Sequence, residues 1–288
     1  MHLLTRTSRS SAAILGAALL AMNVAPSFGD TLIYYNGTGS GTTVTNLGSL
    51  GAAGNGTVQT AGSGTVGFVG TGGAFGSGDS FFNLTNSASN GARIVVPINA
   101  LPGLTGSSWS LTGWFQRTNN TTNDTIFHIG TGDGFGTEEE LYLYGPGGAD
   151  TAVVQNFNPS DVAMGQPASL GTWHFFALTF AASGLNDGKG TLSYYLNDLA
   201  PLTDNTFTLE FTAPFHLGGV GYAPTQSADR DFLGGLDEFA FYNEVLNSSQ
   251  IAGLYAGTAT PLTVPEPSTA ITLLGGLALF GQLRRSRR

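Results

Sequence analysis

Acidic residues beside glycine-rich turns are the side chains of this sequence best suited to hold a metal ion. Asp79 lies within the glycine-rich run 76–80, and the run 132–138 carries two further acids. Calcium takes carboxylate and carbonyl oxygens as ligands, and glycine-rich loops expose their carbonyls. The run 132–138 lacks the Asp-x-Asp-x-Asp-Gly order of an EF-hand, so Asp79 is the stronger of these candidates. The chain has no cysteine, which excludes thiolate metal sites, cysteine nucleophiles and disulfides.

Paired carboxylates could instead support glycoside hydrolysis, which in retaining enzymes needs two of them about 5–5.5 Å apart. Glu138 and Glu140 alternate at the start of an expected strand and therefore share a face. Asp237 and Glu238 are adjacent, so strand alternation predicts that they point to opposite faces and form no pair. We expect an acidic turn, not a glycosidase active site, at Glu138 and Glu140.

The histidines of the central region do not form a recognisable hydrolase site. His128, His174 and His216 each lie inside an apolar run, and no two have the His-x-x-x-His spacing of a zinc site. The chain also lacks a Gly-x-Ser-x-Gly nucleophile elbow. We interpret these histidines as packed or edge residues, and we expect that the protein is not an enzyme.

Two aromatic side chains are candidates for carbohydrate binding, because exposed rings stack on sugars while neighbouring amides bind the hydroxyl groups. Trp114 shares the polar face of the predicted strand 108–117, and its polar neighbours there predict a concave or exposed surface. Tyr222 lies in the glycine-rich loop 218–224. The sequence therefore predicts that Trp114 and Tyr222 contact sugar.

The distribution of charge restricts the possible partners. Only four of the ten Lys and Arg residues lie between residues 10 and 283, whereas all 19 acids lie between Asp30 and Glu266. A body this acidic repels phosphate backbones, which excludes nucleic acid as a partner, and it favours cations. Gly accounts for 43 of 288 residues, but aromatic residues make up 11%, enough for the core of a turn-rich globular domain.

Both ends of the chain have the composition of targeting segments. Residues 1–29 combine an early pair of arginines, the apolar run 12–22 and small residues before Asp30, the order of an export signal peptide. At the other end, residues 258–263 form a linker and residues 264–288 contain an apolar stretch followed by four arginines. We expect this stretch to be a transmembrane helix, with the arginines in the cytoplasm and the acidic body outside.

The C-terminal segment resembles the PEP-CTERM sorting signal of Gram-negative bacteria, with Pro265, Glu266 and Pro267 as its signature. The resemblance implies recognition and cleavage by an exosortase-type membrane enzyme, in a system that accompanies exopolysaccharide production. A plain C-terminal membrane anchor is the alternative, and it leads to almost the same location.

Between the two ends, short alternating runs separated by Gly, Asn and Thr predict an all-β domain. Expected strands begin with Thr31–Tyr35, and the tract 37–78 contains weaker ones at 56–59 and Thr65–Val69. Further strands are predicted at 108–117, 125–129, 141–144, 173–181, 191–197, 215–220 and 235–242. One helix is expected at Ser248–Tyr255, with Asn247 as its N-cap. Together these elements predict two packed antiparallel sheets closed by one short helix.

Four segments in sequence order are similar to LamG-like (concanavalin A-like) jelly rolls: residues 109–115, 172–179, 192–197 and 234–255. The resemblance implies a two-sheet jelly-roll domain over residues 30–257. It also places Asp237 on the last sheet strand near the opening turns, which makes Asp237 the first candidate calcium ligand and Asp79 the second. Relatives often carry an aspartate where this chain has Asn46, so a metal site at the opening turn is not expected.

These observations predict an exported, non-enzymatic protein at the cell envelope, cell surface or extracellular matrix of a Gram-negative bacterium. Its domain is expected to bind polysaccharide, with calcium as a possible cofactor, or to act as an adhesive or matrix component. A glycoside hydrolase or lyase of the same fold is one alternative, and a purely structural surface protein is another.

Overall fold

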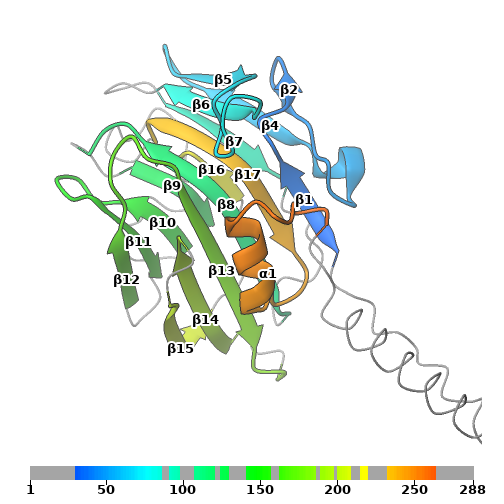
Figure 1. Cartoon of the computed structure of the whole chain (residues 1–288), viewed down its shortest axis with the longest axis vertical. Coiled ribbons are helices and arrows are strands. Elements are labelled where there is room, and N and C mark those ends of the chain that lie inside the picture. The colour runs from blue at the N-terminus through cyan, green and yellow to red at the C-terminus, as the bar shows by residue number, and fades with distance from the viewer. Residues whose placement is uncertain are drawn as a thin grey trace, which may run out of the picture.

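A computed structural model shows a sandwich of two antiparallel β-sheets, with one short helix packed on its outside (Figure 1). The structure describes residues 30–85, 91–97, 107–120, 124–129, 141–156, 162–185, 189–197, 200–208, 215–219 and 232–263. Within these ranges, no helix is long and apolar enough to cross a membrane. The all-β sandwich with one helix that the sequence predicts is confirmed.

The first sheet, sheet A, has the strand order β15-β14-β13-β8-β17-β6-β5, and β1 also pairs with β17. Its strands are β1 (Thr31–Tyr35), β5 (Thr65–Val69), β6 (Phe81–Thr85), β8 (Trp109–Arg117), β13 (His174–Ala182), β14 (Lys189–Leu196), β15 (Leu202–Thr208) and β17 (Gly234–Tyr242). β17, the last strand in the sequence, is central: β8 lies on one side, while β6 and β1 share its other side.

The second sheet, sheet B, has the order β12-β11-β10-β9-β16-β7-β4-β3-β2. Its strands are β2 (Gly39–Ser40), β3 (Thr43–Val44), β4 (Gly56–Thr60), β7 (Ala92–Val96), β9 (Asp124–Ile129), β10 (Leu141–Gly145), β11 (Thr151–Asn156), β12 (Val162–Pro167) and β16 (Phe215–Leu217). A short 3-10 helix, η1 (Gly51–Gly54), precedes β4. The tract 37–78 therefore contributes strands to both sheets.

The main core lies between the sheets and is rich in phenylalanine. Phe115 and Phe176 from sheet A meet Phe127 from sheet B, and the rings of Phe127 and Phe176 stack with centroids 5.8 Å apart. These residues alternate with outward-facing neighbours, which is the pattern that sandwich strands require. Burial of each such ring contributes roughly 1.5–3 kcal/mol.

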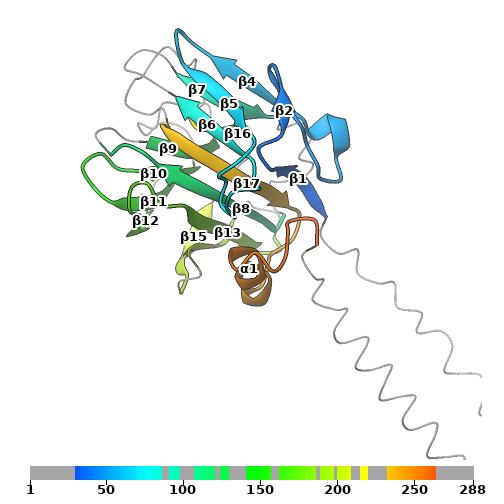
Figure 2. The ribbon, with the colours of Figure 1, turned by 45° about the horizontal axis from the view of Figure 1, so that its top comes forward.

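A second apolar cluster lies on the outer face of sheet A, beneath helix α1 (Ser248–Tyr255). Figures 1 and 2 both show α1 against β8, β13 and β17. Ile251 and Leu254 are its buried apolar contacts with the sheet. The predicted capping box is present: the Asn247 side chain accepts hydrogen bonds from the backbone of Ser249 and Gln250, and Gln250 bonds back to the Asn247 N–H. An eight-residue helix is too short to persist alone, so the cap and this packing hold it together.

One buried ion pair joins the two sheets. The Arg117 side chain on β8 is fully buried, and its Nε lies 3.2 Å from Oδ2 of Asp124 on β9. Its Nη1 donates to the carbonyls of Ala149 and Thr151, both at 3.1 Å. Gly145 makes room for it, because a Cβ there would lie 2.1 Å from the guanidinium carbon. The cation is thus balanced in charge and bonded to several backbone acceptors.

The three central histidines are packed, as the sequence predicts. The exposed fractions of His128, His174 and His216 are 0%, 6% and 2%. His128 and His216 lie directly opposite each other on β9 and β16, with ring centroids 6.0 Å apart. Burial, helped by Arg93 and His128, lowers the pKa of His216 to about 3, so this ring is neutral at physiological pH.

Candidate functional site: a buried carboxylate cluster

Three carboxylates converge on the outer face of sheet A. Asp79, Asp237 and Glu238 each offer an oxygen, and these three oxygens lie within 4.8 Å of one another. Asp237 and Glu238 are buried, with exposed fractions of 1% and 8%, and Asp79 is half-buried. We call these three residues the acid cluster. It brings together both residues for which the sequence predicts calcium ligation, Asp237 and Asp79, although they are far apart in the chain.

A bulge in β17 places two adjacent carboxylates on one side of the sheet. The pairing of β17 with β8 breaks its register between Asp237 and Ala240, and Glu238 has φ +50°. The backbone N–H of Glu238 donates to Oδ1 of Asp237 at 2.8 Å. The prediction that these two side chains point to opposite faces is therefore wrong, because strand alternation fails where an extra residue is inserted.

The loop between β5 and β6 closes over the acid cluster. The backbone N–H of Ala74 donates to Oδ2 of Asp237 at 2.9 Å, and that of Phe75 donates to Oδ2 of Asp79 at 2.8 Å. At Gly73, a Cβ would lie 2.5 Å from Oδ2 of Asp237 and 2.8 Å from Oδ2 of Asp79. The loop thus needs glycine at position 73, and its backbone forms one wall of the cluster.

Tyr34 on β1 forms the opposite wall. Its hydroxyl lies 2.7 Å from Oε1 and 2.8 Å from Oε2 of Glu238 and donates to this carboxylate. Burial, reinforced by the nearby negative charge of Glu238, raises the pKa of Tyr34, so the phenol keeps its proton. Glu238 is therefore held in a fixed orientation by a neutral donor.

The cluster concentrates negative charge in a desolvated place. Burial raises the pKa of Glu238 to about 7, against the lowering effect of its hydrogen bond from Tyr34. Burial also raises the pKa of Asp237 well above its ordinary range, and the charges of Asp79 and Glu238 add to this effect. If all three carboxylates are deprotonated, their negative charges repel one another. Near neutral pH this charge is offset either by protons held within the cluster or by a bound cation.

The donor set suits a hard cation. It consists of carboxylate oxygens in a pocket beside a glycine-rich loop, the chemistry that Ca²⁺ prefers, and it contains no nitrogen or sulfur ligand. The space that a Cβ at Gly73 would fill lies directly beside two of the carboxylates. The residues present therefore fit a calcium ion.

Comparison with known families settles the classification of the chain. The sequence profile of the concanavalin A-like lectin/glucanases superfamily matches residues 88–252, which is more than half of the chain. The chain belongs to this superfamily. The profile of the PEP-CTERM protein-sorting motif matches residues 263–288. Both resemblances that the sequence suggests are confirmed, and no curated protein matches the chain.

Solved structures of the superfamily share the fold at low sequence identity. Domain 4 of AbnA, a GH43 extracellular arabinanase from Geobacillus stearothermophilus in complex with arabinotriose, matches with TM-score 0.56 and 18% identity, over 79% of this chain and 99% of that one. The receptor binding domain of botulinum neurotoxin mosaic serotype C/D matches with TM-score 0.52 and 15% identity, over 79% of this chain and 51% of that one.

A third match is Trypanosoma rangeli sialidase in complex with sialic acid, with TM-score 0.55 and 16% identity, over 78% of this chain and 32% of that one. The chain therefore spans about half of the neurotoxin domain and about a third of the sialidase. Receptor binding domains recur among the matches, next to domains of glycoside hydrolases and sialidases.

Asn46 has a structural role in this member of the superfamily. Its Oδ1 accepts the N–H groups of Tyr34 and Gly48 at 2.8 and 2.9 Å, and its Nδ2 donates to the carbonyls of Leu32 and Gly51 at 3.3 and 3.0 Å. Both amide atoms are thus occupied by backbone groups. These four hydrogen bonds fix the opening turn.

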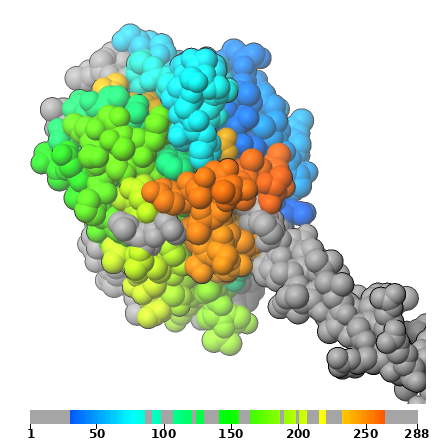
Figure 3. Space-filling view, in the orientation of Figure 1, coloured from blue at the N-terminus to red at the C-terminus, as the bar shows by residue number. Residues whose placement is uncertain are grey.

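The prediction that Trp114 lies on an exposed surface is wrong. Its exposed fraction is 8%, because Phe75, Phe175 and Tyr255 pack against its ring with centroids 5.4, 5.4 and 5.9 Å away. Figure 3 shows the hairpin that carries Phe75 (cyan) next to α1 and the residues that follow it (orange). Alternation gives the correct face of β8 but does not reveal what covers that face.

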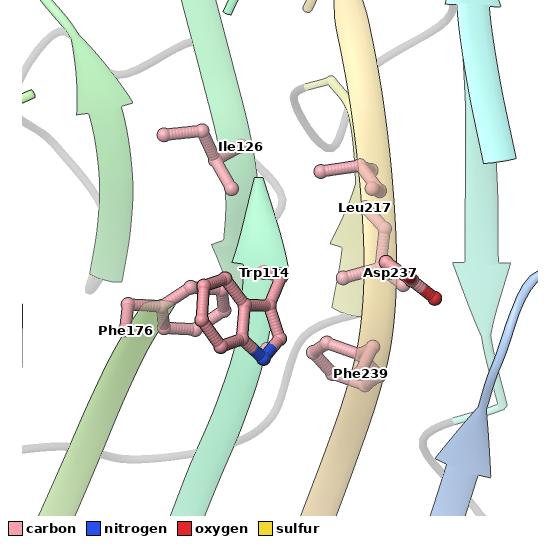
Figure 4. A pocket seen from close by; sticks show the side chains of 8 residues that line it. Trp114, Ile126, Phe176, Leu217, Asp237 and Phe239 are labelled. Atoms are coloured by element: carbon pink, nitrogen blue, oxygen red, sulfur yellow. The ribbon is translucent and has the colours of Figure 1, made fainter. Parts of the chain in front are cut away.

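Trp114 also borders a small apolar cavity at the bulge. Figure 4 shows Ile126, Phe176, Leu217 and Phe239 gathered around this cavity, whereas the carboxylate of Asp237 points away from them. Gly113 also lines the cavity. Its apolar lining separates the core from the acid cluster, which belongs to the outer face.

Several residues with predicted roles lie outside the described residues. They are Tyr222, Glu138, Glu140, Pro265, Glu266 and Pro267. Sequence reasoning missed Glu238 and Tyr34, which complete the acid cluster. A usable signal was present for Glu238, since two adjacent acids inside an otherwise apolar strand are difficult to place unless the strand bulges.

Proposed function

We propose that this protein is exported to the surface or matrix of a Gram-negative bacterium and binds polysaccharide there through its concanavalin A-like domain, without catalysis. The observation that carries the proposal is the presence of this domain and a PEP-CTERM sorting motif in one chain. The sorting motif indicates export. An exosortase-type enzyme is its processing partner, and the C-terminal segment holds the chain in the membrane before cleavage.

Carbohydrate is the proposed ligand because of the superfamily and its structural neighbours. The arabinanase domain 4, which this chain covers almost completely, is in complex with arabinotriose. The sialidase is in complex with sialic acid. The fold hosts both lectins and glycosidases, so the neighbours support a ligand class and not a reaction.

The acid cluster supports a binding role rather than a hydrolytic one. Asp237 and Glu238 are 1% and 8% exposed, and the loop 70–79 and Tyr34 close them off from above and from the side. A glycosidase carboxylate must reach the scissile bond. We propose instead that the cluster holds Ca²⁺, which neutralises its charge and fixes the loop.

Affinity electrophoresis of the full chain tests this proposal. The protein is purified in a detergent without a sugar headgroup and run through native gels that contain arabinan, dextran, alginate or no polymer, with either Ca²⁺ or a chelator. We expect retardation by a polysaccharide, reduced by the chelator. Retardation that is indifferent to the chelator would contradict the calcium proposal alone. Equal mobility in every gel would contradict polysaccharide binding and favour a structural surface protein.

Release of reducing sugar from the same polymers tests the absence of catalysis. We expect none above the level of a protein-free control. Release by the unaltered chain would contradict the non-catalytic proposal.

A further inference from the structure

A row of small and amide residues crosses the outer face of sheet A beyond the cover of α1. Gly67 on β5 lies opposite Asn83 on β6, Asn83 lies opposite Gly235 on β17, and Gly235 lies opposite Gln116 on β8. Their chain neighbours on these strands, such as Phe82 and Phe115, point into the core. Because Gly67 and Gly235 have no side chains, the surface is shallow at these two positions, next to the amide side chains of Asn83 and Gln116.

Trp173, just before β13, lies across this row. A Cβ on Gly235 would lie 2.5 Å from Cη2 of Trp173, so the indole rests directly on the strand backbone. Its Nε1 donates to the carbonyl of Gly72 at 3.3 Å, and Phe81 contacts it edge-on with ring centroids 5.5 Å apart. The ring is only half-buried. It is therefore a fixed aromatic surface that remains partly open to solvent.

Two amide side chains flank the indole, and in the described part of the chain each has hydrogen-bonding atoms that are not in use. Asn83 has no hydrogen bond with any described side chain or loop, and Gln116 uses only its Nε2, which donates to the carbonyl of Gly171 at 3.0 Å. Both side chains are half-buried. An amide both donates and accepts, which matches the paired donor and acceptor character of sugar hydroxyls. A flat aromatic ring with adjacent free amides has the composition of a sugar-binding surface.

Charge restricts the kind of sugar. None of the residues in this row is charged, and the chain between Asp30 and Glu266 has 19 acids and four basic residues. An acidic polymer would be repelled by this surface and would find no Lys or Arg in the row to bind. The complementary ligand is a neutral glycan.

We propose that Trp173, Asn83 and Gln116 form the binding site for a neutral polysaccharide, with a sugar ring stacked on Trp173 and its hydroxyls bonded to the two amides. This inference rests on the proposed function and names its site. It also connects the site to the acid cluster, because the loop that supplies Gly72 O to Trp173 is the loop that Asp79 and Asp237 hold by their hydrogen bonds.

Three variants of the full chain test the site: Trp173→Phe, Trp173→Ala and the double variant Asn83→Ala, Gln116→Ala. Tyr195→Ala is the matched control, because Tyr195 is another partly buried aromatic residue that packs against the same outer cluster. Dissociation constants for arabinan and dextran come from affinity gels in Ca²⁺. We expect weakening by about tenfold or more for Trp173→Ala and for the amide double variant, and by less than about twofold for the control.

Tryptophan fluorescence gives a readout that a purely structural role would not produce. Trp109 and Trp114 are 1% and 8% exposed, so Trp173 is the tryptophan that a bound sugar can reach. We expect a neutral polysaccharide to shift the emission of the unaltered chain and not that of Trp173→Phe. The double amide variant keeps all three tryptophans, and its unchanged melting temperature would show that it folds.

The outcomes separate this inference from the proposed function. If the unaltered chain binds a neutral polymer and all variants bind as well as the control, the site is wrong and the function stands. If the chain binds alginate alone, a neutral ligand is wrong. If it binds no polymer, the proposed function fails, and this site fails with it.

Discussion

Arg117 and the acid cluster are both buried charged groups, yet their charges are balanced in different ways. The Nε of Arg117 lies 3.2 Å from the carboxylate of Asp124, and three backbone carbonyls accept hydrogen bonds from its two Nη atoms. The cluster of Asp79, Asp237 and Glu238 gathers three acids, and its donors in the described part of the chain are backbone amides and Tyr34. The first group is neutralised by the chain itself, whereas the second requires protons or a cation from solution.

This difference separates a structural role from a binding role. An ion pair whose partners both come from the protein, such as Arg117 and Asp124, holds the two sheets together, and its contribution to stability changes little with pH or with added cations. An excess of buried carboxylates makes the stability of the fold depend on pH and on cation concentration. The reason is that bound protons or bound cations supply the positive charge that the cluster lacks. The same changes of pH or cation concentration should therefore affect the acid cluster strongly and the Arg117 pair little.

The largest expected effect comes from breaking the balanced pair. Arg117→Met leaves the Asp124 carboxylate buried without its ion-pair partner, and we expect the free energy of unfolding to fall by about 3–5 kcal/mol. Urea denaturation followed by tryptophan fluorescence measures it. Lys189→Met, at an exposed position, is the control and should change stability by less than about 0.5 kcal/mol. A loss below about 1 kcal/mol for Arg117→Met would show that the pair is not needed.

Calcium should act on the acid cluster with an intermediate effect. At a concentration of about 100 times its dissociation constant, Ca²⁺ should raise the free energy of unfolding by about 2.7 kcal/mol. Asp237→Asn should lose most of this gain, and in chelator it should be at least as stable as the unaltered chain because one repelling charge is gone. The control Asp150→Asn, at an exposed site in the turn between β10 and β11, should keep the full gain. An equal gain in Asp237→Asn would exclude the cluster as the site.

A smaller effect is expected from pH in the absence of calcium. The pKa of Glu238 is raised from 4.5 to about 7, and that of Asp237 is raised as well, so the folded state binds more protons than the unfolded chain in this range. Stability is therefore fully present near pH 4.5 and falls as pH rises through about 7, by on the order of 1 kcal/mol per pH unit.

Melting temperatures between pH 5 and 8 in chelator and in Ca²⁺ measure this dependence. Calcium should flatten the slope, because it binds the deprotonated carboxylates. Glu238→Gln should also reduce the slope in chelator, while Asp150→Asn should leave it unchanged. Stability that rises with pH over this range in chelator would contradict the raised pKa values.

The sequence predicts what depends on local pattern. Ten of the strands in the described residues, the capping box at Asn247 and the choice of Asp79 and Asp237 as candidate ligands follow from alternation, cap chemistry and family resemblance. Strands such as β6, β7, β11, β12 and β15 are not among those that the sequence predicts. Glu238 could not be assigned in this way. Its position depends on a bulge, and a bulge is stabilised by contacts with strands that are distant in the sequence.

Trp114 and Trp173 show that the exposure of a side chain also cannot be predicted from alternation along a strand. Ser110 and Thr112, two polar neighbours of Trp114 on β8, are buried, because Ser110 bonds to residues 244 and 246 and α1 packs on this face. Trp173 directly precedes the apolar run of β13, yet its ring stays partly open to solvent. Exposure is decided by what packs on a face, and alternation within a strand contains no information about it.

The central position of β17 has a consequence for the timing of export. All other strands of sheet A precede β17 in the sequence. Among the described strands, β8 is joined to β6 and β1 only by pairing with β17. Neither half of the sheet can join the other until residue 242 is available, which makes closure late and dependent on contacts distant in sequence. Only α1 and a short linker separate β17 from the sorting motif, so the strand that closes sheet A and the motif emerge in close succession as the chain is exported.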